Sequence, residues 1–145
     1  MIAAARSAAV LLDTCAVIWL ARGSPMAPAA EIRIREAARA RVAYVSPVSA
    51  WEIGLLSWPR PGRILAFLPD PATWFARFMA GPGMVPAPFT AEIAIASSLL
   101  PGSLHGDPAD RLLIATARDM NVPIVTRDHP IRAYADEGHV SVVVC

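Results

Sequence analysis

The sequence contains no lysine, and all 13 basic residues among its 145 are arginine. This absence excludes enzymes that form a Schiff base on lysine and nucleotide-binding domains that contact phosphate with a P-loop lysine. It also excludes phospho-aspartate signalling domains, which gather acidic residues at strand ends but need a lysine beside them. We attribute the arginine-only composition to a base-composition bias of the source genome and infer no specific chemistry from it.

Cysteine is scarce as well, since only Cys15 and Cys145 are present. Two cysteines so far apart form neither a disulfide framework nor the ligand spacing of a zinc site. No histidine lies near Cys15 in the sequence to activate it, so we expect a small buried side chain there and no nucleophile. Low cysteine content is typical of a reducing compartment, and we expect a cytoplasmic protein.

The chain has neither an excess of one charge nor a long hydrophobic run. Its formal net charge is +1, so no bulk charge indicates a nucleic acid, a membrane surface or an acidic partner. The apolar stretch at residues 8–21 contains Asp13 and is shorter than the about 20 residues that cross a bilayer. We therefore expect no signal peptide, no membrane span and no membrane partner.

The composition is that of one folded domain. Hydrophobic residues make up 55% of the chain and charged residues 17%, which is enough apolar material for a substantial core. We expect a single domain over residues 1–145.

Short apolar runs alternate with helical patterns along the chain. We expect strands at residues 10–12, 42–45, 84–88, 123–126 and 140–144. Helices are expected at residues 16–21, 27–41 and 91–100, and after the capping pairs Ser46-Pro47, Asp70-Pro71 and Asp107-Pro108. Strands separated by helices predict an α/β fold with a central, mainly parallel sheet flanked by helices.

Five acidic residues stand where such a fold places functional groups. Asp13 and Asp128 directly follow strands, Glu52 lies in the helix after the second strand, and Asp107 and Asp110 begin a later helix. All five can face the crevice at the carboxyl ends of the strands. Each pair of carboxylates about 4 Å apart would repel by about 4 kcal/mol at an effective dielectric constant near 20. A divalent cation removes this cost, and oxygen ligands favour Mg²⁺ or Mn²⁺ over zinc.

Each acid also has a purely structural alternative. Asp107 before Pro108 forms a good helix N-cap, and Asp13 and Asp128 stand at similar positions. Asp110 complements the helix dipole in the first turn. A solvated helix edge would account for Glu52. Both interpretations stay open for each residue taken alone.

Four segments in order carry a family resemblance: Leu11-Leu12-Asp13-Thr14, Ser49-Ala50-Trp51-Glu52-Ile53, His105-Gly106-Asp107-Pro108-Ala109-Asp110-Arg111-Leu112-Leu113-Ile114-Ala115 and Val125-Thr126-Arg127-Asp128. Together they resemble PIN-domain ribonucleases, specifically toxins of the VapC type, over essentially the whole chain. The resemblance implies a PIN-like fold. It also implies a catalytic cluster around Mg²⁺ or Mn²⁺, formed by Asp13, Glu52, Asp110 and Asp128, with Asp107 in support and Thr14 and Thr126 orienting the cluster. Ala109 stands where the family frequently has phenylalanine.

The resemblance further implies a function. It points to a metal-dependent endoribonuclease that hydrolyses RNA phosphodiester bonds as the toxin of a VapBC-type toxin–antitoxin pair. It also implies a homodimer and a cognate VapB-type antitoxin, which would thread an apolar segment between the early helices and place an arginine among the acids. The alternative is a catalytically inactive PIN-like module that binds protein, in which the acids persist as helix caps.

Arginines and aromatic residues supply the remaining expectations. Arg111 and Arg127 can pair with the neighbouring acids or contact phosphate, and we favour an ion pair for Arg111. We expect a flanking basic patch from Arg33, Arg35, Arg39 and Arg41. Neither His105 nor His129 is assigned a catalytic role. We expect most of the aromatic residues in the core and the surplus at an interface; the set is Trp19, Trp51, Trp58, Phe67, Trp74, Phe75 and Phe78.

Overall fold

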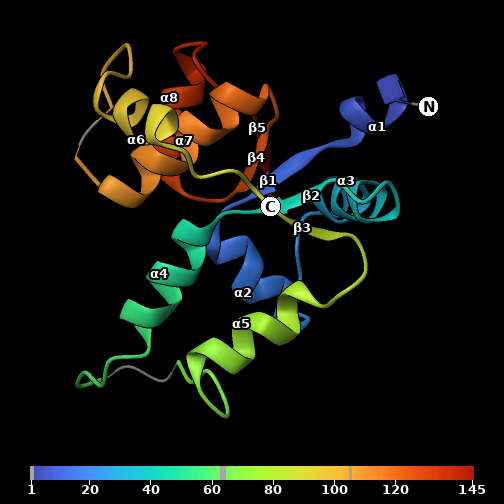
Figure 1. Ribbon diagram of the computed structural model, residues 1–145, viewed down its shortest axis with the longest axis vertical. Coiled ribbons are helices and arrows are strands. Elements are labelled where there is room, and N and C mark those ends of the chain that lie inside the picture. The colour runs from blue at the N-terminus through green and yellow to red at the C-terminus, as the bar shows by residue number, and fades with distance from the viewer. Residues whose placement is uncertain (1, 63–64, 105) are drawn as a thin grey trace.

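The computed structural model describes residues 2–62, 65–104 and 106–145 (Figure 1). In these ranges five short strands form one sheet in which every pairing is parallel. The strands are β1 (Val10–Leu12), β2 (Ala43–Val45), β3 (Met84–Pro86), β4 (Ile124–Thr126) and β5 (Val142–Val144). Each expected strand is present, and the predicted α/β class is confirmed.

The strand order β3-β2-β1-β4-β5 places β1 at the centre of the sheet. The chain first builds outward from β1 to β2 and β3, then crosses back to add β4 and β5 on the other side of β1. This reversal makes the carboxyl ends of β1 and β4 the switch point at which parallel sheets form a crevice. Leu12 is in register with both Val45 and Val125, so these three strands end at the same edge.

Helices join the strands, and most begin at the expected caps. They are α1 (Ile2–Ala8), α2 (Thr14–Arg22), α3 (Pro28–Arg39), α4 (Pro47–Leu56), α5 (Pro71–Met79), α6 (Ala91–Ser98), α7 (Pro108–Met120) and α8 (His129–Asp136). The sequence did not predict α1 or α8 as helices. For α8 the cap was recognised at Asp128, but the helix that follows is short. Helix α2 begins two residues earlier than expected because the Asp13 side chain caps it.

The two faces of the sheet bury separate apolar clusters. Val10 and Leu12 of β1 point into one cluster, together with residues of α2 and α3, while Leu11 points into the other, with residues of α7 and α8. This alternation follows from the two-residue period of a strand. Figure 1 shows α6, α7 and α8 on one side of the sheet and α2, α4 and α5 on the other. The result is a sheet covered by helices on both faces.

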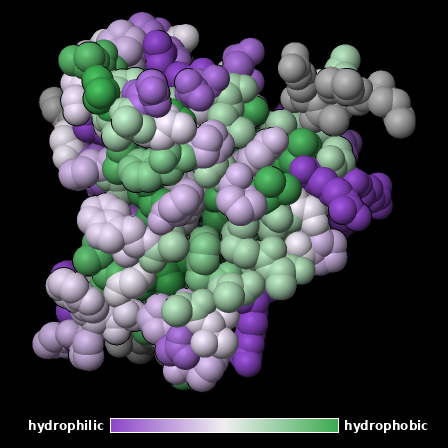
Figure 2. Space-filling view, viewed as in Figure 1, coloured by the Kyte–Doolittle hydropathy of each residue, from purple (hydrophilic) through white to green (hydrophobic). Residues whose placement is uncertain are grey.

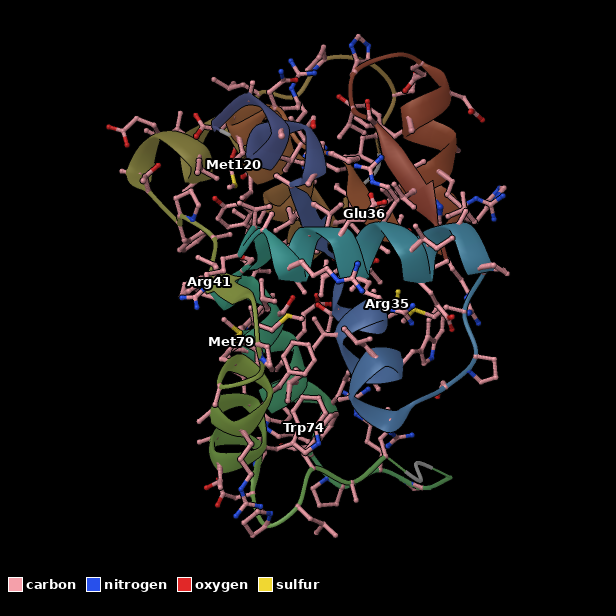
Figure 3. The ribbon with its side chains drawn as sticks, turned by 90° about the vertical axis from the view of Figure 1, so that its right-hand side faces the viewer. Arg35, Glu36, Arg41, Trp74, Met79 and Met120 are labelled. Atoms are coloured by element: carbon pink, nitrogen blue, oxygen red, sulfur yellow. The ribbon has the colours of Figure 1, made fainter. Side chains whose placement is uncertain are left out.

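A larger groove lies away from the switch point, between α2, α3, α5 and β3. It encloses about 780 Å³ and is lined by apolar side chains such as Leu20, Ile34 and Phe78. Figure 3 shows Trp74 of α5 and Arg35 of α3 on its walls. Figure 2 shows hydrophobic residues exposed across the middle of the molecule, between hydrophilic residues at its two ends.

The aromatic residues differ in burial, and the expected interface of the exposed ones stays a prediction. Trp74, Phe75 and Phe78 are partly buried against one core cluster, whereas Trp51 and Trp58 are 52% and 58% exposed. Within the described ranges, none of the helices has both the length and the apolar character needed to cross a bilayer.

Candidate active site

All five predicted acids line a single cleft. It encloses about 420 Å³ and is bordered by Asp13, Thr14, Cys15, Ile18, Trp19, Glu52, Leu56, Asp107, Asp110, Arg127 and Asp128. These residues come from the ends of β1 and β4 and from α2, α4 and α7. The structure therefore brings together side chains up to about 115 residues apart in the chain. Their catalytic and metal-binding roles stay predictions.

Asp13 is held firmly at the end of β1. One carboxylate oxygen accepts a hydrogen bond from the Thr14 backbone N–H at 2.7 Å, and the other accepts one from the Thr126 hydroxyl at 2.6 Å. The Cys15 thiol lies 3.4 Å from that second oxygen. Thr126 in turn accepts a hydrogen bond from the Asp128 backbone N–H at 2.9 Å. The Thr126 hydroxyl therefore ties the acids that follow β1 and β4.

Glu52 is oriented by a second hydroxyl network. The Thr14 hydroxyl donates to Glu52 Oε1 at 2.5 Å, and the Ser49 hydroxyl lies 2.9 Å from that of Thr14. Ser49 is completely buried one helical turn before Glu52, on the same face of α4. The sequence analysis assigned Ser49 no role, although its spacing of three residues from Glu52 was a usable signal.

Three of the acids do cap helices, as the structural alternative proposed. Asp107 accepts hydrogen bonds from the backbone N–H groups of Ala109 and Asp110 at the start of α7. Asp128 accepts one from the Ile131 N–H at the start of α8, and Asp13 caps α2. Capping and lining the cleft are compatible, because each carboxylate oxygen has two lone pairs and can accept more than one contact. Glu52 lies inside α4, so capping does not account for it. Asp110 lies in the first turn of α7, as the helix-dipole alternative requires.

Burial and mutual repulsion raise the pKa values of three acids in the cleft. Burial, followed by the charges of Asp107, Asp128, Asp13 and Glu52, raises the pKa of Asp110 to about 8. Burial is also the main cause of the raised pKa of Glu52 and of Asp13, with neighbouring carboxylates adding to it. The neighbouring charges that contribute to these shifts indicate that the carboxylates lie close enough to repel one another.

The donor set fits a hard divalent cation. The acids offer carboxylate oxygens, the ligands that Mg²⁺ and Mn²⁺ prefer. Burial and the charge of Asp13 raise the pKa of the Cys15 thiol to about 12, so this sulfur stays protonated and is a poor ligand for a soft metal. In the described part of the chain, no three acidic, histidine or cysteine side chains are already arranged as the ligands of one ion.

The arginines differ in part from the expectations. Arg111 donates from Nε to the Ser97 carbonyl at 2.8 Å and from Nη1 to the Leu104 carbonyl at 3.0 Å, in place of the favoured ion pair. The first turn of α7 directs this side chain toward α6 and the loop that follows it. Arg127 lines the acidic cleft, whereas Arg35 lines the larger groove.

The remaining expectations on basic residues concern α3 and the histidines. Helix α3 packs on α1, β1 and β2, and its arginines are not among the described residues that border the acidic cleft. These arginines therefore do not line the cleft, and the flanking basic patch stays a prediction. His129 begins α8 outside the lining, and His105 lies outside the described residues.

Comparisons with known proteins agree with this architecture. The PIN domain family matches residues 10–137. Ribonuclease VapC22 of Mycobacterium tuberculosis (strain ATCC 25618 / H37Rv) is 40% identical over 53 residues, which are 37% of this chain and 41% of that protein. The matched segment is thus less than half of the relative's length.

A solved structure, that of VapBC2 from Rickettsia felis bound to a DNA fragment from their promoter, has the same fold. Its TM-score is 0.65 at 13% identity, and the match covers 93% of this chain and 97% of that chain. The likeness in fold and the family match, which extends over most of the sequence, lead to one conclusion. The chain belongs to the PIN domain family.

Proposed function

We propose that the protein is a Mg²⁺- or Mn²⁺-dependent endoribonuclease that hydrolyses RNA phosphodiester bonds in the cytoplasm, as the toxin of a VapBC-type pair. Membership of the PIN family and the local similarity to Ribonuclease VapC22 support this assignment. The cleft at the ends of β1 and β4 supports metal-dependent hydrolysis, because it gathers five carboxylates that can bind a divalent cation. Its described lining contains no histidine.

The observation that carries the proposal is the position of Asp110. Burial and four surrounding carboxylates raise its pKa to about 8, whereas a favourable interaction with the helix dipole alone would lower the pKa. When it is ionised, Asp110 repels the neighbouring carboxylates and destabilises the metal-free protein. A site that receives a cation gains from the same carboxylate, because the cation removes the repulsion.

The residues divide into ligands and supports. We assign Asp13 and Asp110 as the main direct ligands of the ion, and Glu52 and Asp128 as ligands of a second ion or of its waters, with Asp107 in support. A bound Mg²⁺ or Mn²⁺ would neutralise charge on the phosphate and on the departing oxygen and would make a water more acidic for attack on phosphorus.

Hydroxyl groups keep the carboxylates in place before substrate arrives. Thr126 holds Asp13, while Thr14 holds Glu52 with Ser49 behind it. Such preorganisation leaves little rearrangement to be made during the reaction. No covalent intermediate on the protein is needed, since the Cys15 thiol is protonated and no histidine borders the described cleft.

The larger groove fits the proposed antitoxin. An apolar segment of a VapB-type partner would contact Leu20, Ile34, Trp74 and Phe78, and Arg35 and Arg77 at the groove would bind acidic residues of the same segment. From the groove, α2 leads back to Asp13, so the partner can extend along this helix and place an arginine among the acids. We also propose that the toxin is a homodimer.

The capping contacts favour a second candidate, a protein-binding module without catalytic activity. Asp13, Asp107 and Asp128 would be kept in such a module for their helix caps alone. This candidate predicts no gain in stability on addition of metal, because a satisfied cap has no need of a cation.

Cleavage of a total RNA pool by purified protein tests the proposal. The reaction is run with Mg²⁺, with Mn²⁺ and with EDTA, beside Asp13→Asn and Asp110→Asn variants that are shown to be folded. Asp119→Asn is the matched control, since Asp119 is an exposed acid near the far end of the same helix as Asp110.

Discrete fragments that require metal, disappear in the two cleft variants and persist in Asp119→Asn would support the endoribonuclease. Mapping their ends then identifies the RNA target. No cleavage, together with no metal-induced shift in melting temperature, would overturn the proposal in favour of the binding module.

A further inference from the structure

One cation borders the acidic cleft among the described residues, and it is fixed in place. The guanidinium carbon of Arg127 lies 3.4 Å from the centroid of the Trp19 ring. Its Nε donates a hydrogen bond to the Cys145 carbonyl at 3.2 Å. Trp19 comes from α2 and Cys145 follows β5, so two separate parts of the chain hold the guanidinium of Arg127, which follows β4.

This arrangement leaves the guanidinium suited to bind an oxyanion. Stacking on an aromatic ring uses the face of the planar group, whereas hydrogen bonds to phosphate use the N–H groups at its edge. Arg127 is exposed to solvent even though Trp19 is partly buried beneath it. A ligand that enters the cleft can therefore reach the Arg127 edge without displacing the ring.

The cleft needs such a cation. Its five carboxylates repel the RNA backbone, and a divalent ion at the acids acts only on the phosphate that it contacts. Arg127 stands between Thr126, which holds Asp13, and Asp128, which lines the cleft. Among the described residues that line the cleft, Arg127 is the positive charge that an adjacent backbone phosphate of a bound RNA strand can contact.

We propose that Arg127 binds a backbone phosphate of the RNA substrate at the edge of the acidic cleft, with Trp19 and the Cys145 carbonyl setting the orientation of its guanidinium. This inference rests on the proposed endoribonuclease function and adds to it a residue that positions the substrate. The contact is to phosphate, so it contributes to affinity and placement and does not select a base.

A purely structural role for Arg127 makes different predictions. If the residue only ties the segment after β5 to α2, its removal lowers the melting temperature and leaves the salt dependence of RNA binding unchanged. If it contacts a phosphate, removing its charge reduces the number of salt-sensitive contacts by one. The salt dependence of binding therefore separates the two roles.

The experiment measures binding of a fluorescein-labelled, mixed-sequence single-stranded RNA by anisotropy. The protein carries Asp110→Asn to prevent cleavage, and Mg²⁺ is present throughout a series of KCl concentrations. Arg127→Gln, Arg127→Lys and Trp19→Phe are compared with Arg132→Gln, which removes an exposed arginine of α8 that is not in the cleft lining. Melting temperatures confirm folding, and each substitution without Asp110→Asn is also assayed for cleavage of total RNA.

Arg127→Gln is expected to weaken binding about tenfold and to reduce the slope of log K against log salt by about 0.7. Arg127→Lys should restore the slope but only part of the affinity. An ammonium group carries the charge, but it has no planar face to stack on Trp19 while it binds phosphate. Trp19→Phe should keep the slope with a smaller loss of affinity. Arg132→Gln should match the parent protein.

Unchanged affinity and slope in Arg127→Gln, in a protein that cleaves RNA, would overturn this inference and leave the proposed function standing. If the parent protein does not cleave RNA but binds it in a way that depends on Arg127, the proposed nuclease function is overturned and the phosphate contact is retained. A parent protein that neither binds nor cleaves RNA would overturn both.

Discussion

The hydroxyl of Thr126 donates a hydrogen bond to the Asp13 carboxylate at 2.6 Å, across 113 positions of sequence. The same hydroxyl oxygen accepts the backbone N–H of Asp128. Because Leu12 and Val125 are paired in the sheet, the residues that follow β1 and β4 meet at the same edge. Parallel pairing at the sheet centre thus determines the distance between two acids of the cleft.

Replacing Thr126 by valine tests this tie. The hydrogen bond from Thr126 lowers the pKa of Asp13, so its loss raises that pKa further and frees the carboxylate to rotate. Thr126→Val should reduce RNA cleavage about tenfold or more and lower the free energy of unfolding by about 1 to 3 kcal/mol. Cleavage assays and denaturant titrations measure both effects.

Thr126→Ser is the control for this prediction, because it keeps the hydroxyl and removes only a methyl group. Cleavage by Thr126→Ser should stay near that of the parent protein. Equal activity in the valine and serine variants would show that the hydroxyl has no part in positioning Asp13.

Asp110 gives the metal-free protein a characteristic pH dependence. Burial and the neighbouring carboxylates raise its pKa from 3.8 to about 8. Between these values the folded protein retains a proton that the unfolded chain has released, so the stability from Asp110 is present at low pH and is lost as pH rises toward 8. In EDTA, the melting temperature of the parent protein should therefore fall relative to that of Asp110→Asn as the pH rises.

Added Mg²⁺ should reverse this trend. The ion must displace the proton from Asp110, so the stabilisation that it gives increases with pH over the same range. Thermal melts at several pH values, with EDTA and with Mg²⁺, measure both trends. Asp119→Asn should follow the parent protein, and a pH dependence that Asp110→Asn leaves intact would contradict the assignment of the high pKa to Asp110.

The sequence predicted much of the site because its chemistry is local. Asp13 and Asp128 immediately follow apolar runs, and Asp107-Pro108 begins a helix, so each position follows from a short segment. The sheet topology allowed these residues to face one crevice with Glu52 and Asp110, and the structure places all five in one cleft. Their shared catalytic role came from the family resemblance and stays a prediction.

Contacts between distant segments could not be predicted in the same way. The hydrogen bonds from Arg111 to the Ser97 and Leu104 carbonyls depend on how α6 and the following loop pack on α7. The stacking of Arg127 on Trp19 depends likewise on the spacing between β4 and α2. Hydrophobic patterns and capping residues predict single helices and strands, whereas these contacts arise from the packing of several helices and strands against one another.

Gly83 shows how close one of these packing contacts is. Its φ is +80°, and a Cβ built at this position would lie 2.0 Å from the Ala38 carbonyl oxygen, so β3 approaches the end of α3 at a distance that only glycine permits. Gly83→Ala must separate the two backbones or distort the strand. The variant should lose about 3 kcal/mol or more of unfolding free energy, from strain and overpacking together.

Gly62→Ala serves as the control, because it introduces backbone strain without a steric contact to the described residues. Gly62 has a similar φ of +78°, but no described residue lies within 4 Å of a Cβ built there, so we expect its substitution to cost only the backbone strain of about 1 to 2 kcal/mol. Denaturant unfolding of both variants gives the difference that is due to the contact with Ala38. Strand β3 is the edge strand beside β2 and borders the larger groove, where we propose that the antitoxin binds. Gly83→Ala should therefore weaken antitoxin binding more than it reduces RNA cleavage at the acidic cleft. Similar stability losses in the two variants would show that α3 and β3 can separate without cost.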